Sequence, residues 1–571
     1  MSFTFSIIGG GLTGTSMLYQ FVTKLRKAFD HRSLGAAKIK VQVFEKQNTF
    51  GPGFPHSERN VMPFHITNMC AKDMGILSSK KSDFQDWVTY RKKMLEEHFP
   101  WLHDASFTYN RCSHYPRAIM GEYLKERFHE ACQIAQTLGV SVDLYPQTEV
   151  VDLKQKRRKI VLTIFDLRSK STFSCVADRV LLATGHWVEE KRSQNFFPSP
   201  WPAQNLLQNI PAGEKIAVLG TSLSAIEVVL TLTSDGRFSR HNNRLDYIPS
   251  SSPRRLTLYS RRGLLPKVRG KMGKYRNRYL SPKKIEHLSA FNKGVLTLDT
   301  LFQLLNRELK TVYGYAINWK EVVNPRQSPL DLLKQYIVDA KMGDGSDGEL
   351  LWQTVLHQSF DMIREIYPRL RQEDRKRFDD KYASLFFTHA ATQPIINAEK
   401  TLALMRAGFV DIIKLGREYQ ININDSEETY EITYKDQLGI EKRAMYRYVV
   451  NARGQSKSIE TDPSPLIQRM LKSGLIQTGE AQIIQQLKRQ GLKDANPTPA
   501  TDQRYKTESI WIDPATHQLM RLSSDNIASK LKAVYAVGAM TRGQIIDTST
   551  ANGIVKSTSR IANDLVNELK K

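Results

Sequence analysis

Three glycines near the N-terminus have the spacing of a dinucleotide-binding turn. Gly9, Gly11 and Gly14 form the pattern GxGxxG directly after an apolar, strand-like run and at the start of a helical run. The first glycine permits a tight turn, the second lets the backbone approach a pyrophosphate, and the third lets the helix pack closely. The N–H groups at the start of the helix attract the anion. The predicted loop contacts are Gly9, Gly10, Gly11, Leu12, Thr13 and Gly14.

A carboxylate at the end of the next strand-like run supports a dinucleotide site. Glu45 ends the run KVQVFE and is followed by Lys46. A carboxylate at this place accepts hydrogen bonds from the hydroxyls of a ribose. The spacing from the glycines exceeds the usual value of about 20 residues, so the helix and its connection must be long.

A second, relaxed loop occurs later in the chain. Gly220, Ser222 and Ala225 form GxSxxA between the strand-like run EKIAVL and a helical run. Ser222 carries a side chain where the pattern has its second glycine, so the glycine pattern alone is weak, and the flanking strand and helix strengthen it. The loop is predicted to bind a second dinucleotide, with Leu223 and Ser224 contributing further contacts.

Basic residues stand where a site for NAD places its carboxylate. The run RLTLYSRRG ends with Ser260, Arg261 and Arg262. Two guanidinium groups form bidentate bonds with a 2′-phosphate, whereas an acid would repel it. The sequence therefore favours NADPH over NADH at the second loop. The competing interpretation is that one of these arginines only forms a salt bridge at the surface.

These loops require strand, helix and strand elements around them, and the sequence contains that order twice, about 210 residues apart. Apolar alternation at 147–167 and 417–436 predicts a β-meander in each half, followed by a strand that stops at a glycine. We predict an α/β protein with two Rossmann-like dinucleotide-binding domains, β-meanders and a helical insertion. The expected parts are residues 1–212 and 456–571 for the first domain, which the resemblance described below implies to bind FAD, and 213–455 for the NAD(P)H domain with the insertion at about 270–387.

Composition excludes several other classes of protein. The 571 residues include 40% hydrophobic and 25% charged residues, as in globular proteins, and no apolar run is long enough to span a bilayer. The cysteines, Cys70, Cys112, Cys132 and Cys175, are too far apart for CxxC zinc pairs or a close redox dithiol, so no metal site is predicted and a reducing, cytoplasmic location is expected. The net charge of +25 is compatible with nucleic acid, an anionic membrane, an anionic cofactor or a generally basic surface.

Several further segments resemble one flavoprotein family. DRVLLATGH and KAVYAVGAMTRG resemble the strands that approach FAD in flavoproteins built from two dinucleotide-binding domains. HITNMCAKDMG, HYPRAIMGEYL and SRRGLLP resemble segments of the FAD/NAD(P)-binding proteins similar to FAD-dependent urate hydroxylase and aspartate N-monooxygenase. Together with both glycine loops, these matches follow the order of the family and miss mainly the helical insertion.

The resemblance implies cofactor contacts outside the glycine loops. These are expected at Asn68, Arg117, Val151, Thr184, Gly185 and Gly538. Asn68, Arg117 and His389 are also candidates for lining a substrate pocket. Two departures stand out: Ala539 replaces the acidic residue that many relatives place after the last glycine, and THAATQP has His389 but lacks the arginines of the family.

The resemblance also implies an activity. We expect an FAD-dependent, NAD(P)H-using monooxygenase that hydroxylates a small polar or nitrogen-containing substrate with molecular oxygen, through a flavin hydroperoxide. The alternatives are a flavin-dependent reductase or dehydrogenase without oxygen insertion and a non-enzymatic basic module with a redox fold. Nucleic acid is not expected as a partner, because aromatic side chains are sparse in the basic run that follows Arg262.

Overall fold

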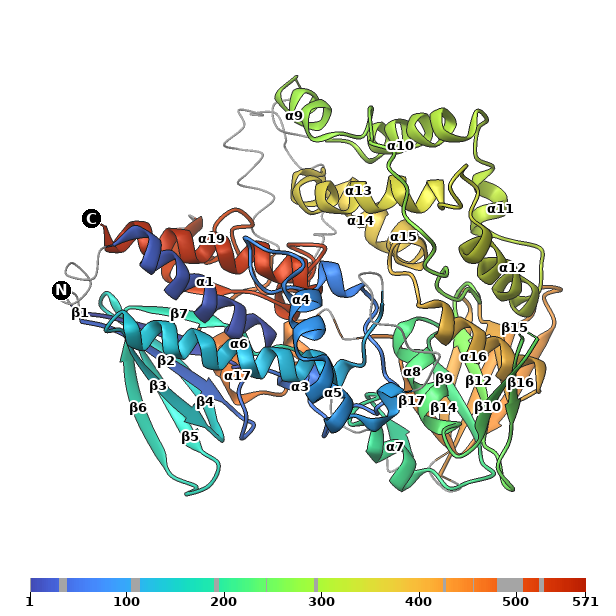
Figure 1. Ribbon diagram of the computed structural model, residues 1–571, viewed down its shortest axis with the longest axis horizontal. Coiled ribbons are helices and arrows are strands. Elements are labelled where there is room, and N and C mark those ends of the chain that lie inside the picture. Colours follow the sequence, from blue (N-terminus) through green and yellow to red (C-terminus); the bar gives the residue numbers. More distant parts are fainter. Residues whose placement is uncertain are drawn as a thin grey trace, which may run out of the picture. The chain divides into compact units, whose positions relative to one another are not determined.

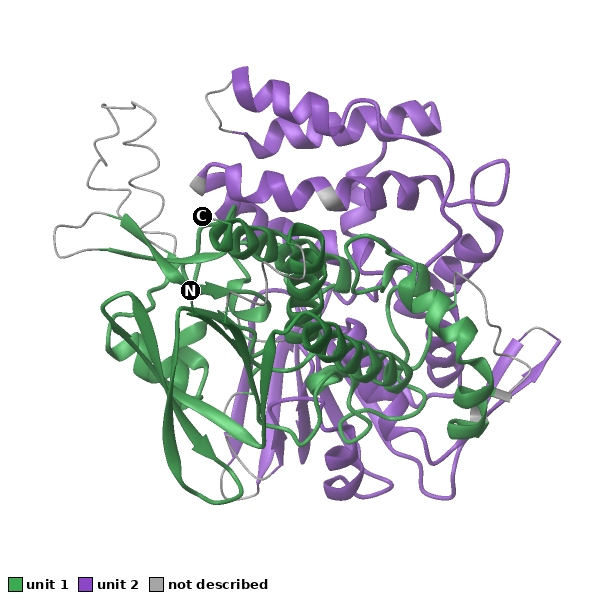
Figure 2. Cartoon of the chain, turned by 60° about the vertical axis from the view of Figure 1, so that its left-hand side comes forward, with its two compact units in different colours: residues 1–189, 455–571 green, residues 190–454 purple. Residues whose placement is uncertain are grey.

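The computed structural model describes residues 2–29, 38–103, 113–188, 195–242, 244–291, 296–424, 428–454, 456, 458–479, 507–522 and 528–570. The expected connection at 30–37 and Cys112 lie outside these residues. The chain forms two units, one from residues 1–189 and 455–571 and the other from residues 190–454 (Figure 2). The sequence places the first boundary at 212/213. The structure places it earlier because strand β8 (Phe196–Phe197) pairs with β17 (Tyr448–Asn451) of the second unit.

The first unit is built on a six-stranded sheet with the order β18-β19-β7-β1-β2-β3. All neighbours are parallel except β18 and β19. The strands are β1 (Ser2–Ile8), β2 (Lys38–Glu45), β3 (Ser141–Pro146), β7 (Arg179–Leu182), β18 (Gln518–Leu522) and β19 (Ala528–Ala536). A separate antiparallel meander consists of β4 (Thr148–Lys156), β5 (Lys159–Asp166) and β6 (Thr172–Ala177).

Helices and the meander cover opposite faces of this sheet. Figure 1 shows α1 (Leu12–Ala28), α6 (Arg117–Thr137) and α19 (Ala551–Leu569) side by side on one face. Phe5 and Ile7 pack against these helices, whereas Val180 and Leu182 pack on the side of the meander and α17 (Pro465–Lys472). Both faces are buried, which explains why the parallel strands are almost continuously apolar. The remaining helices of the unit are α3 (Gly53–His56), α4 (Asp83–Tyr90) and α5 (Lys92–His98).

The second unit repeats this plan. Its parallel sheet has the order β13-β12-β9-β17-β8, which corresponds strand by strand to β3-β2-β1-β7-β19. The strands not yet given are β9 (Lys215–Leu219), β12 (Arg255–Ser260), β13 (Val410–Lys414), the hairpin β10 (Arg237–His241) and β11 (Arg244–Ile248), and the meander β14 (Tyr419–Asn424), β15 (Thr429–Lys435) and β16 (Glu441–Tyr446). Helices α7 (Ala203–Asn209), α8 (Leu223–Leu232) and α16 (Ile395–Arg406) contribute apolar side chains to the core on one face, and the meander contributes to the core on the other.

A group of helices separates β12 from α16 in the sequence. It comprises α9 (Pro282–Phe291), α10 (Leu298–Tyr313), α11 (Trp319–Val323), α12 (Pro329–Met342), α13 (Leu351–Ile366), α14 (Gln372–Arg377) and α15 (Ala383–Ala390). Glu308, which is fully buried, accepts hydrogen bonds from the Tyr275 hydroxyl and from the N–H groups of Tyr279 and Leu280. The Glu308 carboxylate therefore holds the segment before α9, residues 275–280, against α10. Among the described helices, none combines the length and the apolar character that crossing a membrane requires.

A close backbone approach in the first glycine loop leads to a prediction about stability. A side chain at Gly9, whose φ is +107°, would approach the Ala183 carbonyl oxygen to 2.2 Å. Gly9→Ala should cost about 1–3 kcal/mol for the backbone conformation and about 1–3 kcal/mol more for the overlap. Urea unfolding of the flavin-free protein measures this loss without a contribution from cofactor binding.

Gly139 supplies the matched control. It also has a positive φ, of +72°, but a side chain there meets nothing within 4 Å. Gly139→Ala should therefore cost only about 1–2 kcal/mol, the conformational part alone. Equal losses in the two variants would contradict the steric role of the Ala183 carbonyl.

Candidate functional site: two dinucleotide loops

The first glycine loop joins the ends of three strands. The Gly9 N–H donates to the Phe44 carbonyl at 2.8 Å, and the Ala183 N–H donates to the Ile8 carbonyl at 2.8 Å. A side chain at Gly14 would approach the Gly9 carbonyl oxygen to 2.1 Å, so α1 packs directly on the turn. Gly11 is the N-cap of α1, no side chain caps the helix, and its first turn contains no acidic residue. The N–H groups at the start of α1 are thus suited to an anion.

Gly11 also has a structural role that the sequence did not indicate. A side chain there would approach the Gly53 Cα atom to 3.1 Å. The Gly51 N–H donates to the Gly10 carbonyl at 2.8 Å, which fixes the segment before α3 against the loop. The second glycine is therefore required by the protein's own packing as well as being suited to a pyrophosphate.

Glu45 organises the same edge of the sheet. Its Oε2 accepts the Gly10 N–H at 2.7 Å and its Oε1 accepts the Gln47 N–H at 2.9 Å. Burial raises the pKa of this carboxyl, and the hydrogen bonds from the backbone partly oppose the shift. An ionised carboxylate has about four acceptor positions, so Glu45 retains capacity for ribose hydroxyls. Lys46 instead forms an ion pair with Glu149 at 2.6 Å.

Val151 occupies an irregularity in β4. The pairing with β5 shifts between Val150 and Asp152, so Val151 is the extra residue of a β-bulge. A bulge leaves backbone groups of the bulged strand outside the ladder of hydrogen bonds. Val151 lies two residues beyond Glu149, which binds Lys46, so the bulge lies close to the end of β2.

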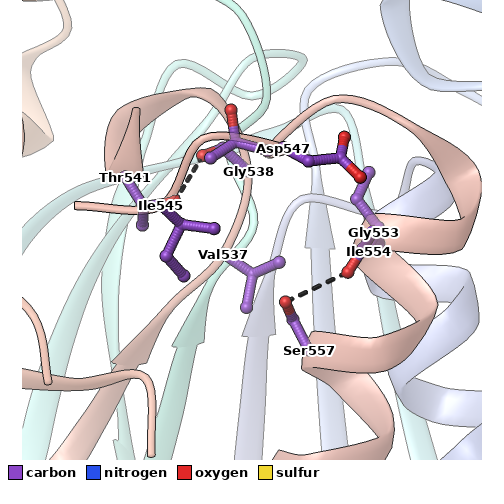
Figure 3. A pocket seen from close by; sticks show the side chains of 9 residues that line it. Val537, Gly538, Thr541, Ile545, Asp547, Gly553, Ile554 and Ser557 are labelled. Carbon is purple, nitrogen blue, oxygen red and sulfur yellow. Dashed lines mark hydrogen bonds between the residues drawn. The ribbon is translucent and has the colours of Figure 1, made fainter. Parts of the chain in front are cut away.

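The ends of β7 and β19 bring the later candidates to the same edge. Thr184 follows Ala183, and its backbone nitrogen lies 3.3 Å from the position of a side chain at Gly9. The Val537 N–H donates to the Leu182 carbonyl, which aligns Gly538 with this edge. Side chains at Gly185 or Gly538 would meet nothing within 4 Å. Gly538 and the first turns of α19 line a small hollow (Figure 3).

Asn68 and Arg117 lie on two segments that pair with each other. The Arg117 N–H donates to the His65 carbonyl, and the Thr67 N–H donates to the Tyr115 carbonyl, both at 2.8 Å. Arg117 is also the first residue of α6. Sequence spacing does not indicate this pairing, because the two segments are about 50 residues apart. The structure therefore brings the two candidates together.

His56 links this pair of segments to the glycine loop. Burial and then the charge of Arg117 lower the pKa of His56 to about 3. A side chain at Gly121 of α6 would approach the His56 carbonyl oxygen to 2.3 Å, and α3 begins at Gly53, which faces Gly11. Arg117 is thus connected through α3 to the first loop.

Sequence reasoning missed Arg542 at this edge. The pKa of His186 is lowered to about 4 by desolvation and by the charges of Arg542 and Arg117. The His186 side chain is solvent-exposed, and both guanidinium groups act on it. Arg542 follows the last strand of the sheet, at the same edge as Thr184 and Gly538.

The second loop reproduces the backbone of the first. The Gly220 N–H donates to the Tyr259 carbonyl, and the Ala452 N–H donates to the Leu219 carbonyl. A side chain at Gly220 would approach the Ala452 carbonyl oxygen to 2.6 Å. Ser222 is the N-cap of α8, which begins at Leu223 and Ser224, and no side chain caps this helix. The two loops therefore present the same set of uncapped N–H groups.

The second unit has a hydroxyl where the first has a carboxylate. Ser260 ends β12, and its Oγ lies 3.0 Å from Thr221 Oγ1 and accepts the Gly263 N–H at 3.0 Å. Thr221 takes the place of Gly10 in the loop, and Ser260 takes the place of Glu45. The hydrogen bonds at this strand end are made without a negative charge.

Arginines surround Ser260, but they are not equivalent. Arg261 is exposed, whereas Arg262 donates to the Lys381 carbonyl at 2.7 Å and so holds the helical insertion. Desolvation and then the charges of Arg261 and Arg417 lower the pKa of Arg262. Arg417 was missed in the sequence because it follows β13, far from Arg261 along the chain. The parallel pairing of β12 with β13 brings it to the same edge.

His389 lies in the second unit, on α15. Its Nδ1 is 2.9 Å from the Leu385 carbonyl oxygen, and its ring makes an edge contact with Trp352. Asn68 and Arg117 belong to the first unit. The structure thus assigns the three expected pocket residues to two different units.

The fold and these loops define an FAD-NAD(P)-binding flavoprotein. Residues 6–187 match the family model described as FAD-NAD(P)-binding. The expected α/β fold with two Rossmann-like units is confirmed by the sheets described above and by solved flavoproteins. The ornithine N-hydroxylase of Kutzneria sp. 744 has a TM-score of 0.50 at 11% identity, with all of both chains covered.

Three curated proteins are similar to parts of this sequence. The uncharacterized protein YdhS of Escherichia coli K12 is 23% identical over 77% of this chain and 82% of its own. L-aspartate N-monooxygenase of Streptomyces davaonensis is 22% identical over 52% of this chain and 57% of its own. Nitrosuccinic acid synthase of Aspergillus oryzae is 26% identical over 38% of this chain and 36% of its own. The resemblance to aspartate N-monooxygenase that the motifs indicate is confirmed.

The position of Glu45 leads to a prediction about cofactor recognition. Glu45→Ala should weaken FAD binding to the flavin-free protein about tenfold to a hundredfold, because hydrogen bonds to a charged acceptor are worth about 1.5–3 kcal/mol. FMN lacks the adenosine ribose, so its affinity should not change. Flavin fluorescence titration measures both affinities.

Two further variants complete this test. Glu45→Gln keeps an acceptor for the Gly10 N–H and should lose less affinity than Glu45→Ala. Glu149→Ala removes a neighbouring carboxylate that binds Lys46 and should leave FAD binding nearly unchanged. Equal weakening of FAD and FMN by Glu45→Ala would show that Glu45 only supports the loop.

Proposed function

We propose that this flavoprotein is an FAD-dependent monooxygenase that uses NADPH and hydroxylates the nitrogen of a small polar substrate. The main support is the contrast between its two equivalent strand ends. Glu45 in the first unit suits an unphosphorylated ribose, and Ser260 with its arginines in the second suits a phosphorylated one. The two loops thus share one backbone geometry, but the side chains at the neighbouring strand ends have opposite charge.

The first unit offers a complete set of contacts for FAD. The start of α1 would hold the pyrophosphate, Glu45 the ribose, and the bulge at Val151 the adenine. Thr184, Gly185 and Gly538 would approach the flavin, since the two glycines have open space beside them. When bound, the flavin supplies the redox chemistry, namely hydride acceptance and the activation of oxygen.

Arg117 and Asn68 would position groups beside the flavin. The backbone of Arg117 is fixed by the hydrogen bond to His65, and a guanidinium group offers five N–H donors. His56, which the charge of Arg117 and burial keep neutral, adds no second charge next to it. Arg117 is therefore suited to orienting an anionic or polar group of the substrate or cofactor.

The second unit offers a site for NADPH. The start of α8, at Ser222, Leu223 and Ser224, would hold the pyrophosphate. Arg261 and Arg417 are both exposed at the end of the sheet and would bind the 2′-phosphate. Arg262 has one guanidinium nitrogen bound to Lys381 and would contribute mainly through its charge.

The choice of a nitrogen atom as the target rests on the relatives. Two curated relatives and the ornithine enzyme act on amino acids or form a nitrosuccinic acid, according to their names. We extend this substrate class, small amines and amino acids, to the present chain. Molecular oxygen would be the second substrate.

Anaerobic stopped-flow absorbance tests this proposal. NADPH should bleach the flavin, and air should restore its absorbance. A substrate amine or amino acid should form a hydroxylated product in proportion to the NADPH consumed. Bleaching without any hydroxylated product across a panel of such compounds would favour a reductase. A protein that purifies without flavin and takes none up would favour a binding module.

The arginines lead to a prediction of nucleotide preference. In the double variant Arg261→Ala, Arg417→Ala, flavin reduction by NADPH should fall about tenfold to a hundredfold for each arginine removed. NADH lacks the 2′-phosphate and should be almost unaffected. The ratio of reduction efficiencies with the two nucleotides, at low and high salt, measures the change.

Controls separate this effect from the general positive charge. Arg244→Ala removes an exposed arginine of the same unit that pairs with Asp246, and it should leave the ratio unchanged. Arg262→Ala should lower the melting temperature of the protein, because this variant loses the hydrogen bond to the Lys381 carbonyl. If the double variant keeps its preference for NADPH at high salt, the 2′-phosphate binds elsewhere.

A further inference from the structure

A short extended segment after the arginines is fixed against the helical insertion. Two buried glutamines hold its backbone on both sides of Lys267: the Gln393 amide donates to the Pro266 carbonyl, and the Gln353 amide donates to the Val268 carbonyl. The Lys267 N–H also donates to the Thr388 carbonyl at 2.9 Å. The position of the Lys267 side chain is therefore set by hydrogen bonds to its own backbone and its neighbours.

The Lys267 ammonium lacks a polar partner within the described part of the chain. Its Nζ lies 3.5 Å from the centroid of the Tyr336 ring, a cation–π contact from α12, and no hydrogen bond or ion pair to it is recorded among those residues. Burial lowers the pKa of Lys267 to about 8, partly offset by the charge of Asp339. An ammonium has three donors, and a partly buried one normally finds acceptors for them.

Lys267 is the main positive charge among the groups that face it. Burial, followed by the charge of Lys267, lowers the pKa of His389 on α15 to about 4, so this imidazole is neutral at pH 7. Tyr336 and Asp339 face Lys267 from α12, and the ring centroid of Trp352 on α13 lies 5.6 Å from that of His389. The Lys267 ammonium thus lies on the Tyr336 ring, and the neutral imidazole of His389, on which its charge acts, contacts Trp352.

We propose that Lys267, Tyr336, His389 and Trp352 form a subsite for an oxyanion, either a carboxylate or a phosphate. The ammonium supplies the charge and the free donors, and the aromatic rings supply an apolar wall. This arrangement suits an anionic group attached to an organic body better than a fully hydrated ion.

The chain path limits which anions can reach this subsite. Thr221 of the second glycine loop donates to the Leu264 carbonyl at 2.7 Å, and Lys267 lies three residues further on. Three residues span at most about 11 Å, so the subsite is close to the loop. The anion is thus either a phosphate of the dinucleotide or a carboxylate of the substrate. The assignment to a substrate carboxylate rests on the proposed function, whereas anion binding at Lys267 does not.

The test uses the full-length flavin-loaded protein and tryptophan fluorescence, with Trp352→Phe to identify the signal of Trp352. Succinate, inorganic phosphate and NADP⁺ are titrated into the wild type and into Lys267→Met, Lys267→Arg and Lys334→Met. Lys334 is an exposed lysine of the same helix as Tyr336 and serves as the matched control. No reductant or oxygen chemistry is needed, so failure of the hydroxylase assay does not affect the result.

Lys267→Met should weaken binding of succinate or phosphate at least tenfold, Lys267→Arg should retain part of it, and Lys334→Met should retain all of it. Affinity in the wild type should fall about tenfold between pH 7 and pH 9 as the ammonium loses its proton. If NADP⁺ displaces succinate and itself weakens in Lys267→Met, the anion is a dinucleotide phosphate. If succinate still binds in the presence of NADP⁺, the anion is a substrate carboxylate.

Amine labelling of the wild type provides a measurement that does not depend on a variant. An amine-reactive reagent at pH 8, followed by mass spectrometry, should modify Lys267 more slowly in succinate or phosphate, while Lys334 is unaffected. Absence of anion binding, or equal binding by the wild type and Lys267→Met with no protection of Lys267, would overturn the proposal.

Discussion

The close approach of a glycine to a carbonyl oxygen at a strand end is the constraint on which both halves of the molecule depend. At Gly9 the oxygen belongs to Ala183, and at Gly220 it belongs to Ala452. Each glycine also donates its N–H to the strand on its other side. Because no side chain separates the three strands, they end together and the helix begins at once. The uncapped N–H groups of that helix are therefore directed to the edge where the strands end.

Charge, rather than backbone shape, distinguishes the two units. Glu45 and Ser260 occupy equivalent strand ends and both satisfy an N–H group of a neighbouring turn. A buried carboxylate would repel a phosphate placed beside it, whereas the serine hydroxyl makes its hydrogen bond without charge. The substitution of one hydrogen-bond acceptor by another thus keeps the fold and leaves the second edge free to carry Arg261, Arg262 and Arg417.

Local sequence patterns were sufficient to predict the loops, the flanking elements and the meanders, because their periodicities and glycines lie within short segments. Long-range pairing was not accessible in this way. The bulge at Val151 depends on its register with β5, and the place of Arg417 depends on β13 pairing with β12. The boundary at 212/213 was misplaced because β8 has only two residues and its role is set by its partner β17. Arg262 was expected at the nucleotide, but its bond to Lys381 requires knowledge of the insertion.

The segment from Ser260 to Gly270 connects the nucleotide edge with the insertion. Its first part carries Ser260 and the arginines, and its second part carries Lys267 and the backbone groups bound by Gln353 and Gln393. Arg262 belongs to both, since its charge acts at the nucleotide edge and its guanidinium group binds the insertion. Within the described residues, hydrogen bonds from this segment therefore join the end of β12 directly to the insertion.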